Sequence, residues 1–313
     1  MSKKPSARPT KPARSAAATP PAHPDLHTQL GLRPGQSLPL LQELHILTRE
    51  GRINQDSRRK LKQVNHLLQF IEKELANLPA RAGGPLLADH GAGKSYLGFM
   101  LYDLWCQPRG QGHIWGIETR PELVERARQL AVRLGFERMH FLNLSAADAA
   151  RAADLPDEFD IVTALHACDT ATDDAIDFAL RKRARAIVLV PCCQAEVAAR
   201  LRMNKALQLA RTPLAELWRH PLHTREIGSQ LTNVLRCLYL EAMGYAVTVT
   251  ELVGWEHSMK NELIIATRSG HRKRSAARRM HELLAPFGLQ ALLPERFPLL
   301  PPPDERPETP ESA

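Results

Sequence analysis

An alternation of short apolar runs with amphipathic segments between residues 86 and 190 constrains the fold of this chain more than any other feature. The amphipathic segments repeat apolar residues every three or four positions, as helices do, whereas the short runs have the length of buried strands. We expect strands at 86–88, 114–117, 139–142, 160–165 and 186–190, and helices at 96–105, 121–134, 146–153 and 171–180. Strands that alternate with helices predict a parallel sheet with helices on both faces.

The chain departs from this alternation after residue 190. Helical patterns at 195–210 and 231–242 precede two strands, at 245–252 and 262–267, that no helix separates, which predicts a terminal antiparallel hairpin. Helical patterns at 40–49 and 54–76 precede the first strand. The sequence therefore predicts an α/β fold with a Rossmann-like seven-stranded, mostly parallel sheet, helices on both faces and a small helical N-terminal lobe.

Composition shifts divide the chain into successive segments. We expect a disordered basic arm at 1–24, the helical N-terminal lobe at 25–79, the main α/β domain at 80–270, a basic C-terminal helix at 271–292 and a Pro-rich disordered tail at 293–313. The arm is rich in Lys, Arg, Ser, Ala and Pro, a composition that an organelle transit peptide would share.

The net charge of +8 suggests a polyanionic partner such as RNA or DNA. The five cysteines form no C-x-x-C pair and no zinc-finger spacing, so we expect a reducing, cytoplasmic location and no metal. No apolar run approaches the roughly 18 residues of a membrane span, so we expect no membrane partner.

Residues 85–97 combine the end of a strand, a glycine turn and the start of a helix. Asp89 ends the apolar run, Gly91 and Gly93 form the turn, and we expect the unpaired N–H groups of a helix N-terminus to meet a nucleotide-like ligand there. Two other nucleotide sites fit this stretch less well. A phosphate-binding loop would need glycine at position 88, where this chain has Ala88, and a dinucleotide-binding turn would need a third glycine, which this turn lacks.

Two further carboxylates favour S-adenosylmethionine as this ligand. Glu118 ends the second strand, where it would accept hydrogen bonds from the ribose hydroxyls, and Asp148 follows the third strand, near the expected adenine. We expect Asp89 close to the methionine portion. Lys94 and Tyr96 of the turn, together with His166, complete the predicted cofactor-binding set.

Three other stretches carry the residues predicted for catalysis. His166, Cys168 and Asp169 follow the fourth strand, Cys192 follows the fifth strand, and Lys260 precedes the last strand. Because the carboxyl ends of parallel strands border the ligand crevice, these side chains would face the transferable methyl group. A cysteine thiolate that attacks C6 of a pyrimidine is one alternative, and a buried apolar role for Cys192 and Cys193 is another.

These motifs together resemble class I S-adenosylmethionine-dependent methyltransferases of the "methyltransferase domain 32" type and, more distantly, the eukaryotic tRNA 2′-O-ribose methyltransferase with N-terminal zinc fingers. The matching pieces are Asp89–Leu97, Leu165-His166-Ala167-Cys168, Pro191-Cys192-Cys193 and Lys260-Asn261, within residues 55–268. The resemblance implies the fold, the cofactor and methyl transfer. Asp169 stands where the family usually has glycine, and the zinc-finger segments are missing.

The sequence thus predicts a methyltransferase that modifies RNA, either tRNA or rRNA. The positive charge, the basic arm and the stretch Arg268–Arg279 favour RNA, and the lack of an Asn/Asp-Pro-Pro-Phe/Tyr motif argues against methylation of an exocyclic base amine. Methylation of protein and a non-catalytic module that binds RNA or a partner remain open as alternatives.

Overall fold

The computed structural model describes residues 26–165, 167–191, 194–203, 213–252 and 262–303. The chain divides into two compact units, Met1–Pro34 and Gly35–Ala313. Helix α1 (Leu26–Leu30) belongs to the first unit, and every other described element belongs to the second.

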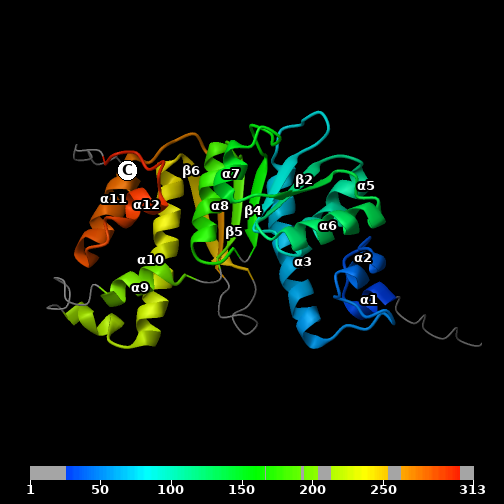
Figure 1. Cartoon of the computed structure of the whole chain (residues 1–313), viewed down its shortest axis with the longest axis horizontal. Coiled ribbons are helices and arrows are strands. Elements are labelled where there is room, and N and C mark those ends of the chain that lie inside the picture. The colour runs from blue at the N-terminus through cyan, green and yellow to red at the C-terminus, as the bar shows by residue number, and fades with distance from the viewer. Residues whose placement is uncertain (1–25, 166, 192–193, 204–212, 253–261, 304–313) are drawn as a thin grey trace, which may run out of the picture. The chain divides into compact units, whose positions relative to one another are not determined.

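The second unit is built around a seven-stranded sheet, as the alternation predicts (Figure 1). The strand order is β3-β2-β1-β4-β5-β7-β6. The first five strands in sequence run parallel, whereas β7 runs antiparallel to both β5 and β6. The strands are β1 (Leu86–His90), β2 (His113–Glu118), β3 (Met139–Asn143), β4 (Ile161–Leu165), β5 (Ala186–Val190), β6 (Tyr245–Glu251) and β7 (Glu262–Arg268).

The helices form where apolar residues repeat at helical spacing. Most predicted helices are present with shifted ends, and the helix predicted at 96–105 continues from α4 into a π-helical turn, η1. The helical elements of this unit are α2 (Leu38–Glu43), α3 (Gln55–Ala76), α4 (Tyr96–Leu101), η1 (Tyr102–Cys106), α5 (Gln107–Arg109), α6 (Pro121–Leu134), α7 (Ala146–Arg151), α8 (Thr170–Arg181), α9 (Glu196–Met203), η3 (Pro213–Trp218), α10 (Pro221–Ala242), α11 (Arg274–Leu284), η4 (Ala285–Phe287) and α12 (Leu292–Arg296).

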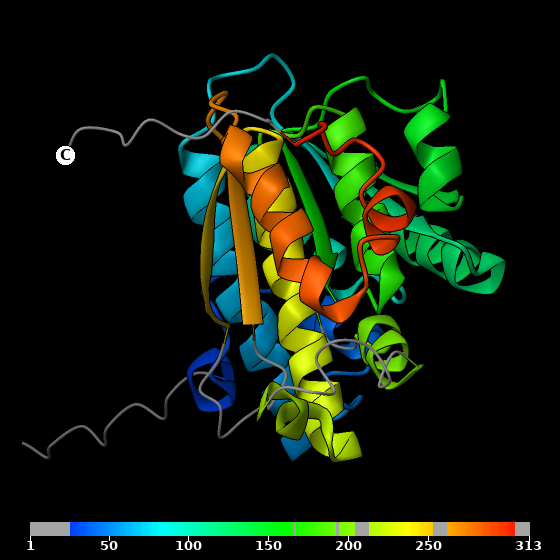
Figure 2. The same cartoon turned by 90° about the vertical axis from the view of Figure 1, so that its left-hand side faces the viewer.

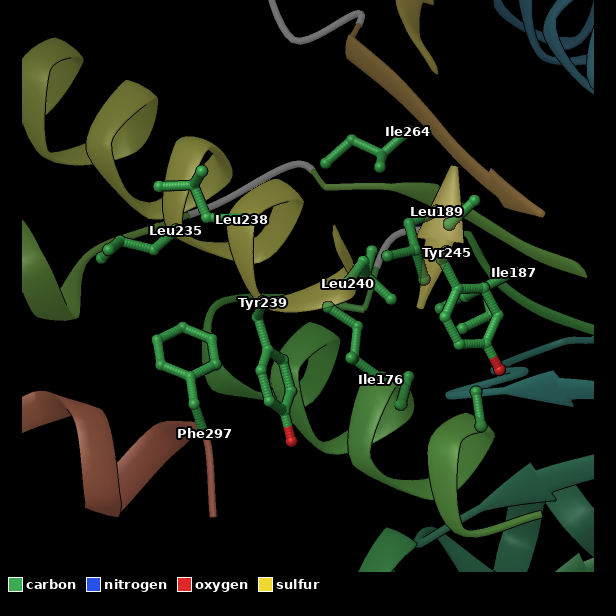
Figure 3. Close-up of a cluster of buried hydrophobic side chains, with 14 of the residues drawn as sticks. Ile176, Ile187, Leu189, Leu235, Leu238, Tyr239, Leu240, Tyr245, Ile264 and Phe297 are labelled. Carbon is green, nitrogen blue, oxygen red and sulfur yellow. The ribbon is translucent and has the colours of Figure 1, made fainter. Parts of the chain in front are cut away.

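Helices cover both faces of the sheet. One face packs on α8, α10, α11 and α12. Figure 3 shows part of the resulting core, with Ile176 of α8, Tyr239 of α10 and Phe297, which follows α12, packed with Ile187, Leu189 and Ile264 from the strands. On the other face α3 packs on α4, and Glu74 of α3 accepts a hydrogen bond of 3.1 Å from Thr267 of β7. Figure 2 shows the blue-to-cyan α3 and the green α8 on opposite sides of the sheet. Because helices cover both faces of the sheet, β5 is apolar and buried along its whole length.

Two long helices extend past the carboxyl ends of the parallel strands. The last turn of α3 lies beside Thr267, which pairs with the first residue of β5, and α10 ends three residues before β6 begins. Both helices therefore end at the amino edge of the sheet. Each has 22 residues and is about 33 Å long, against about 17 Å for a five-residue strand. The starts of α3 and α10 thus project beyond the carboxyl edge, toward the bottom of Figure 1.

The C-terminal segment differs from the disordered tail predicted at 293–313. Residues Leu292–Arg296 form α12, and Leu293 and Phe297 are buried. The ring centroid of Phe297 lies 5.0 Å from that of Tyr239 on α10, so an aromatic contact anchors this part of the tail. The rest of the tail, from residue 304, and the predicted arm at 1–24 lie outside the described residues.

Candidate functional site

The parallel strands bring separate parts of the sequence to one edge of the sheet. The loops after β1, β2, β4 and β5 begin at this carboxyl edge, and β7 starts there because it runs in the opposite direction. A Cβ atom on Gly91, after β1, would lie 3.6 Å from the Cβ of Ala167, after β4. The glycine turn and the loop that carries Cys168 and Asp169 are therefore neighbours.

The glycine turn directs its N–H groups inward rather than toward a ligand. Gly91 and Gly93 have φ angles of 67° and 58°, which glycine adopts without strain. The N–H groups of Gly91 and Ala92 both donate to the carbonyl of Ile117, at 2.9 and 3.1 Å, and Gly93 donates to Glu118 at 2.8 Å. The prediction that this turn presents unpaired N–H groups is therefore wrong for these three residues. None of the three offers its N–H group to an anion, which favours a ligand without a phosphate.

Glu118 is the most heavily hydrogen-bonded carboxylate at this edge. Its Oε2 accepts from the Gly93 N–H at 2.8 Å and from Nη2 of Arg120 at 3.0 Å. Its Oε1 accepts from Nε of Arg120 at 3.0 Å, from the Arg120 N–H at 3.1 Å and from the Thr119 hydroxyl at 3.3 Å. Burial alone would raise the pKa of Glu118, but the hydrogen bonds from Arg120 and Gly93 outweigh it and lower the pKa to about 2. Glu118 is therefore ionised at neutral pH.

Asp89 has the opposite electrostatic environment. Its side chain is buried, and its Oδ1 accepts a hydrogen bond of 2.9 Å from the Thr163 hydroxyl. Burial, with a smaller contribution from the nearby charge of Glu118, raises the pKa of Asp89 to about 7 against the lowering effect of hydrogen bonds from Thr163 and the Gly98 N–H. The two predicted cofactor carboxylates therefore lie at adjacent strand ends, one ionised and one that titrates near neutral pH.

The other predicted cofactor residues are arranged differently. Asp148 is exposed in the first turn of α7, where its carboxylate accepts from the Ser145 hydroxyl at 2.6 Å and its N–H donates to Ser145 at 3.2 Å. This pair caps the helix. Lys94 and Tyr96 line a cavity of about 220 Å³ between α4 and α6, whose lining contains neither Asp89 nor Glu118.

Asp169 serves as a structural link between two loops. Its φ and ψ of 51° and −121° belong to a region that favours glycine, which gives a physical reason for the family's usual glycine at this position. Its Oδ1 accepts from the N–H groups of Ala195 and Glu196, at 3.0 and 3.3 Å, and so caps the start of α9. The carboxylate predicted to act as a catalytic base therefore already has two partners that join the loops after β4 and β5.

A buried polar network that sequence reasoning missed supports the same loops. Arg236 is fully buried on α10 and donates to Asp173 at 2.6 Å, to the side chain of Asn233 at 3.1 Å and to the carbonyl of Asp169 at 2.7 Å. Asn233 accepts from Gln194 at 3.0 Å and donates to Glu262 at 2.6 Å. The only signal in the sequence is that polar residues interrupt the apolar face of α10 at Asn233 and Arg236.

Three of the predicted catalytic residues, His166, Cys192 and Lys260, lie outside the described residues, as does Cys193. Cys168 is described and exposed, three residues past the end of β4. Their catalytic roles stay predictions.

The basic stretch Arg268–Arg279 lies away from this edge. Because β7 runs antiparallel to β5, the stretch begins at the amino edge of the sheet, where Arg268 donates its N–H to the carbonyl of Arg185. Lys273 and Arg279 both donate to Glu241, at 2.8 Å each, so part of this charge is neutralised. Within the described ranges no group of His, Cys, Asp or Glu could hold a metal ion. No helix in these ranges has both the length and the apolarity to span a membrane.

Comparisons with known proteins agree with this arrangement. Residues 59–200 match the model of a family described as a methyltransferase domain. This match confirms the resemblance predicted from the motifs, with S-adenosylmethionine as the cofactor.

The similarity to individual proteins is weaker. A glutathione S-transferase C-terminal domain-containing protein from Homo sapiens is 26% identical over 237 residues, which cover 69% of this chain and 34% of that protein. Its counterpart from Bos taurus is 25% identical over 244 residues with the same coverage. This chain thus spans about a third of the length of the curated relatives it matches. The solved structure of magnesium protoporphyrin IX methyltransferase from Synechocystis PCC 6803 is 14% identical, covers 74% of this chain and 95% of its own, and has a TM-score of 0.41. A structural similarity this low adds nothing to the family match.

Proposed function

Since residues 59–200 form a methyltransferase domain of the S-adenosylmethionine-dependent class, we propose that the protein is an active enzyme that transfers a methyl group to RNA. The observation that carries the proposal is the pair of carboxylates, Asp89 and Glu118, at the carboxyl ends of adjacent strands beside a glycine turn.

These residues fit the proposed cofactor. Glu118 is ionised and would hold the two ribose hydroxyls, Asp89 would lie near the methionine portion, and Gly91 and Gly93 leave the turn free of side chains. The inward-directed N–H groups of the turn suit a ligand that carries no phosphate. When bound, S-adenosylmethionine supplies a methyl group on a positively charged sulfur.

The chain's own contribution to the reaction is alignment, exclusion of water and removal of one proton. An acceptor hydroxyl must lose its proton as the methyl group arrives, so a base at the carboxyl edge is required. Asp169 is a poor candidate because its carboxylate accepts two N–H groups at the start of α9. His166 and Lys260 stay the proposed proton-handling residues.

Exposed basic side chains near the carboxyl edge support RNA as the acceptor. Arg58, Arg59, Lys60 and Lys62 are exposed in the first two turns of α3, where the helix projects past the sheet. Arg202 of α9 and Arg225 of α10 lie together near the projecting start of α10, beside the exposed His220 and His223. Positive charge on both sides of the site would contact backbone phosphates on either side of the acceptor nucleotide.

The acceptor class can be tested with labelled cofactor and fractions of total RNA and total protein. We expect label in RNA, and we expect Glu118→Ala to abolish it. Label in protein alone would refute the RNA proposal. Binding of S-adenosylhomocysteine without label in either fraction would instead support a non-catalytic binding module.

Two charge-reversal variants test the proposed RNA surface. The double variant Arg59→Glu, Lys60→Glu changes exposed residues of α3 near the carboxyl edge, and Arg272→Glu, Arg274→Glu changes exposed residues beyond β7, at the opposite edge. We expect only the first variant to weaken RNA binding and to reduce the slope of log affinity against log salt by about two. An equal effect of both variants would show that binding depends on net charge and not on this surface.

A further inference from the structure

Protein donors occupy every acceptor position of the Glu118 carboxylate. Five hydrogen bonds of 2.8 to 3.3 Å reach its two oxygens, from Gly93, Thr119 and Arg120. A carboxylate offers about four lone-pair positions, so none is left for another donor. The two ribose hydroxyls of a bound cofactor can therefore reach Glu118 only if protein donors leave.

The guanidinium of Arg120 is the group that can leave most readily. The N–H groups of Gly93 and Arg120 belong to the backbone of the turns after β1 and β2, and their positions follow from the strands. The Arg120 side chain is 59% exposed, whereas that of Glu118 is 7% exposed, so the guanidinium can move into water without crossing the core. Its fork donates two hydrogen bonds, from Nε and Nη2, which is the number that a ribose diol supplies.

We propose that Arg120 is an internal competitor for the cofactor: its guanidinium occupies the Glu118 oxygens that the ribose hydroxyls take, and it swings into solvent when the cofactor binds. The inference rests on the proposed function only in placing the ribose at Glu118. It does not depend on the acceptor or on catalysis.

This competition has two consequences. Part of the binding free energy is used to break the contact between Glu118 and Arg120, so the cofactor binds less tightly than it would to a free carboxylate. The guanidinium also returns to Glu118 as the demethylated product leaves, which favours release. Arg120 thus sets the affinity of the site and the lifetime of the bound product.

Replacement of Arg120 by methionine tests the proposal through binding alone. Arg120→Met keeps the aliphatic part of the side chain and removes both guanidinium donors, and Arg272→Met, which changes an exposed arginine beyond β7 at the opposite edge, is the control. We expect calorimetry to show S-adenosylhomocysteine binding about two- to fivefold tighter to Arg120→Met, the range for an ion pair with one exposed partner, and unchanged binding to the control. Higher salt should tighten binding to the wild type, because it screens the competing ion pair, and should not do so for Arg120→Met.

The possible outcomes separate this proposal from a purely structural role. If Arg120 only stabilises the turn, the free variant melts at a lower temperature but binds S-adenosylhomocysteine with wild-type affinity, which overturns the proposal. If Arg120 orients Glu118 for the ribose, the variant binds more weakly, which also overturns it. Failure of both proteins to bind would show that the site does not hold the cofactor, which overturns both this proposal and the proposed function. Normal binding with no methyl transfer to RNA would contradict the proposed function and leave this inference intact.

Discussion

Replacement of Asp89 by asparagine should make the protein more stable at alkaline pH and weaken its cofactor site. The side chain is buried, and its pKa is raised from an ordinary value of 3.8 to about 7. An asparagine has the same shape, can donate to the Thr163 hydroxyl and can accept from the Gly98 N–H. It removes the charge and keeps the packing.

The sign and size of the effect follow from the raised pKa. Between about pH 4 and pH 7 the folded protein holds a proton on Asp89 that the unfolded chain releases, so stability falls as pH rises through this window and levels off above about pH 7. Each pH unit within the window corresponds to about 1.4 kcal/mol. Between about pH 5 and pH 8 the wild type should lose about 3 kcal/mol relative to Asp89→Asn.

Urea unfolding of both proteins at the two pH values measures this difference. Comparison between the variant and the wild type cancels the groups that titrate alike in both proteins, and the exposed Asp154→Asn controls for the loss of one carboxylate. A stability difference that does not change with pH would show that Asp89 ionises normally in the folded protein and would refute the reasoning. Calorimetry should show weaker S-adenosylhomocysteine binding to Asp89→Asn at pH 8, because the variant lacks a negative charge near the expected ammonium group.

Three further substitutions test other parts of the site. Arg236→Met leaves Asp173 as an unpaired buried carboxylate and should lower the free energy of unfolding by about 3 to 5 kcal/mol. The surface substitution Arg225→Met should lower it by less than about 1 kcal/mol. An equally small loss for Arg236→Met would contradict the role of the network. Asp169→Ala should lower the free energy of unfolding by about 1 to 2 kcal/mol because the α9 cap is lost. Asp169→Asn keeps an acceptor oxygen and should change this free energy little. Equal losses for the two variants in thermal unfolding would contradict the role of Asp169 as a cap. Gly93→Ala places a Cβ atom at a φ of 58° and should cost about 1 to 2 kcal/mol in denaturant unfolding, so a neutral result would contradict the strain argument.

The sequence predicted the strands well because their signal is local. The apolar run at 186–190 became β5 with the same ends, and the helix predicted at 121–134 became α6 unchanged. The helix predicted at 231–242 was too short, since α10 starts at Pro221. Its projecting start lacks a continuous apolar face, so hydrophobic spacing alone could not reveal it.

The candidate site was predictable only in part. The positions of Asp89, Gly91, Gly93 and Glu118 at strand ends follow from local patterns, so the sequence could place them at one edge of the sheet. It could not show that Glu118 is already paired with Arg120. Nor could it show that the turn's N–H groups point inward, because both facts depend on contacts between β1 and β2.

The sequence by itself thus determined the α/β architecture, the resemblance to methyltransferases and the residues at the ends of the strands, because strand and helix periods and glycine turns are properties of neighbouring residues. Only the tertiary structure decided what those residues contact. In the folded protein Asp169 caps the start of α9, and Arg236 is buried beneath the loops after β4 and β5. The stretch Arg268–Arg279 begins at the amino edge of the sheet, opposite the candidate site. These relations join residues that are far apart in sequence, and they exist only when the strands are aligned in one register.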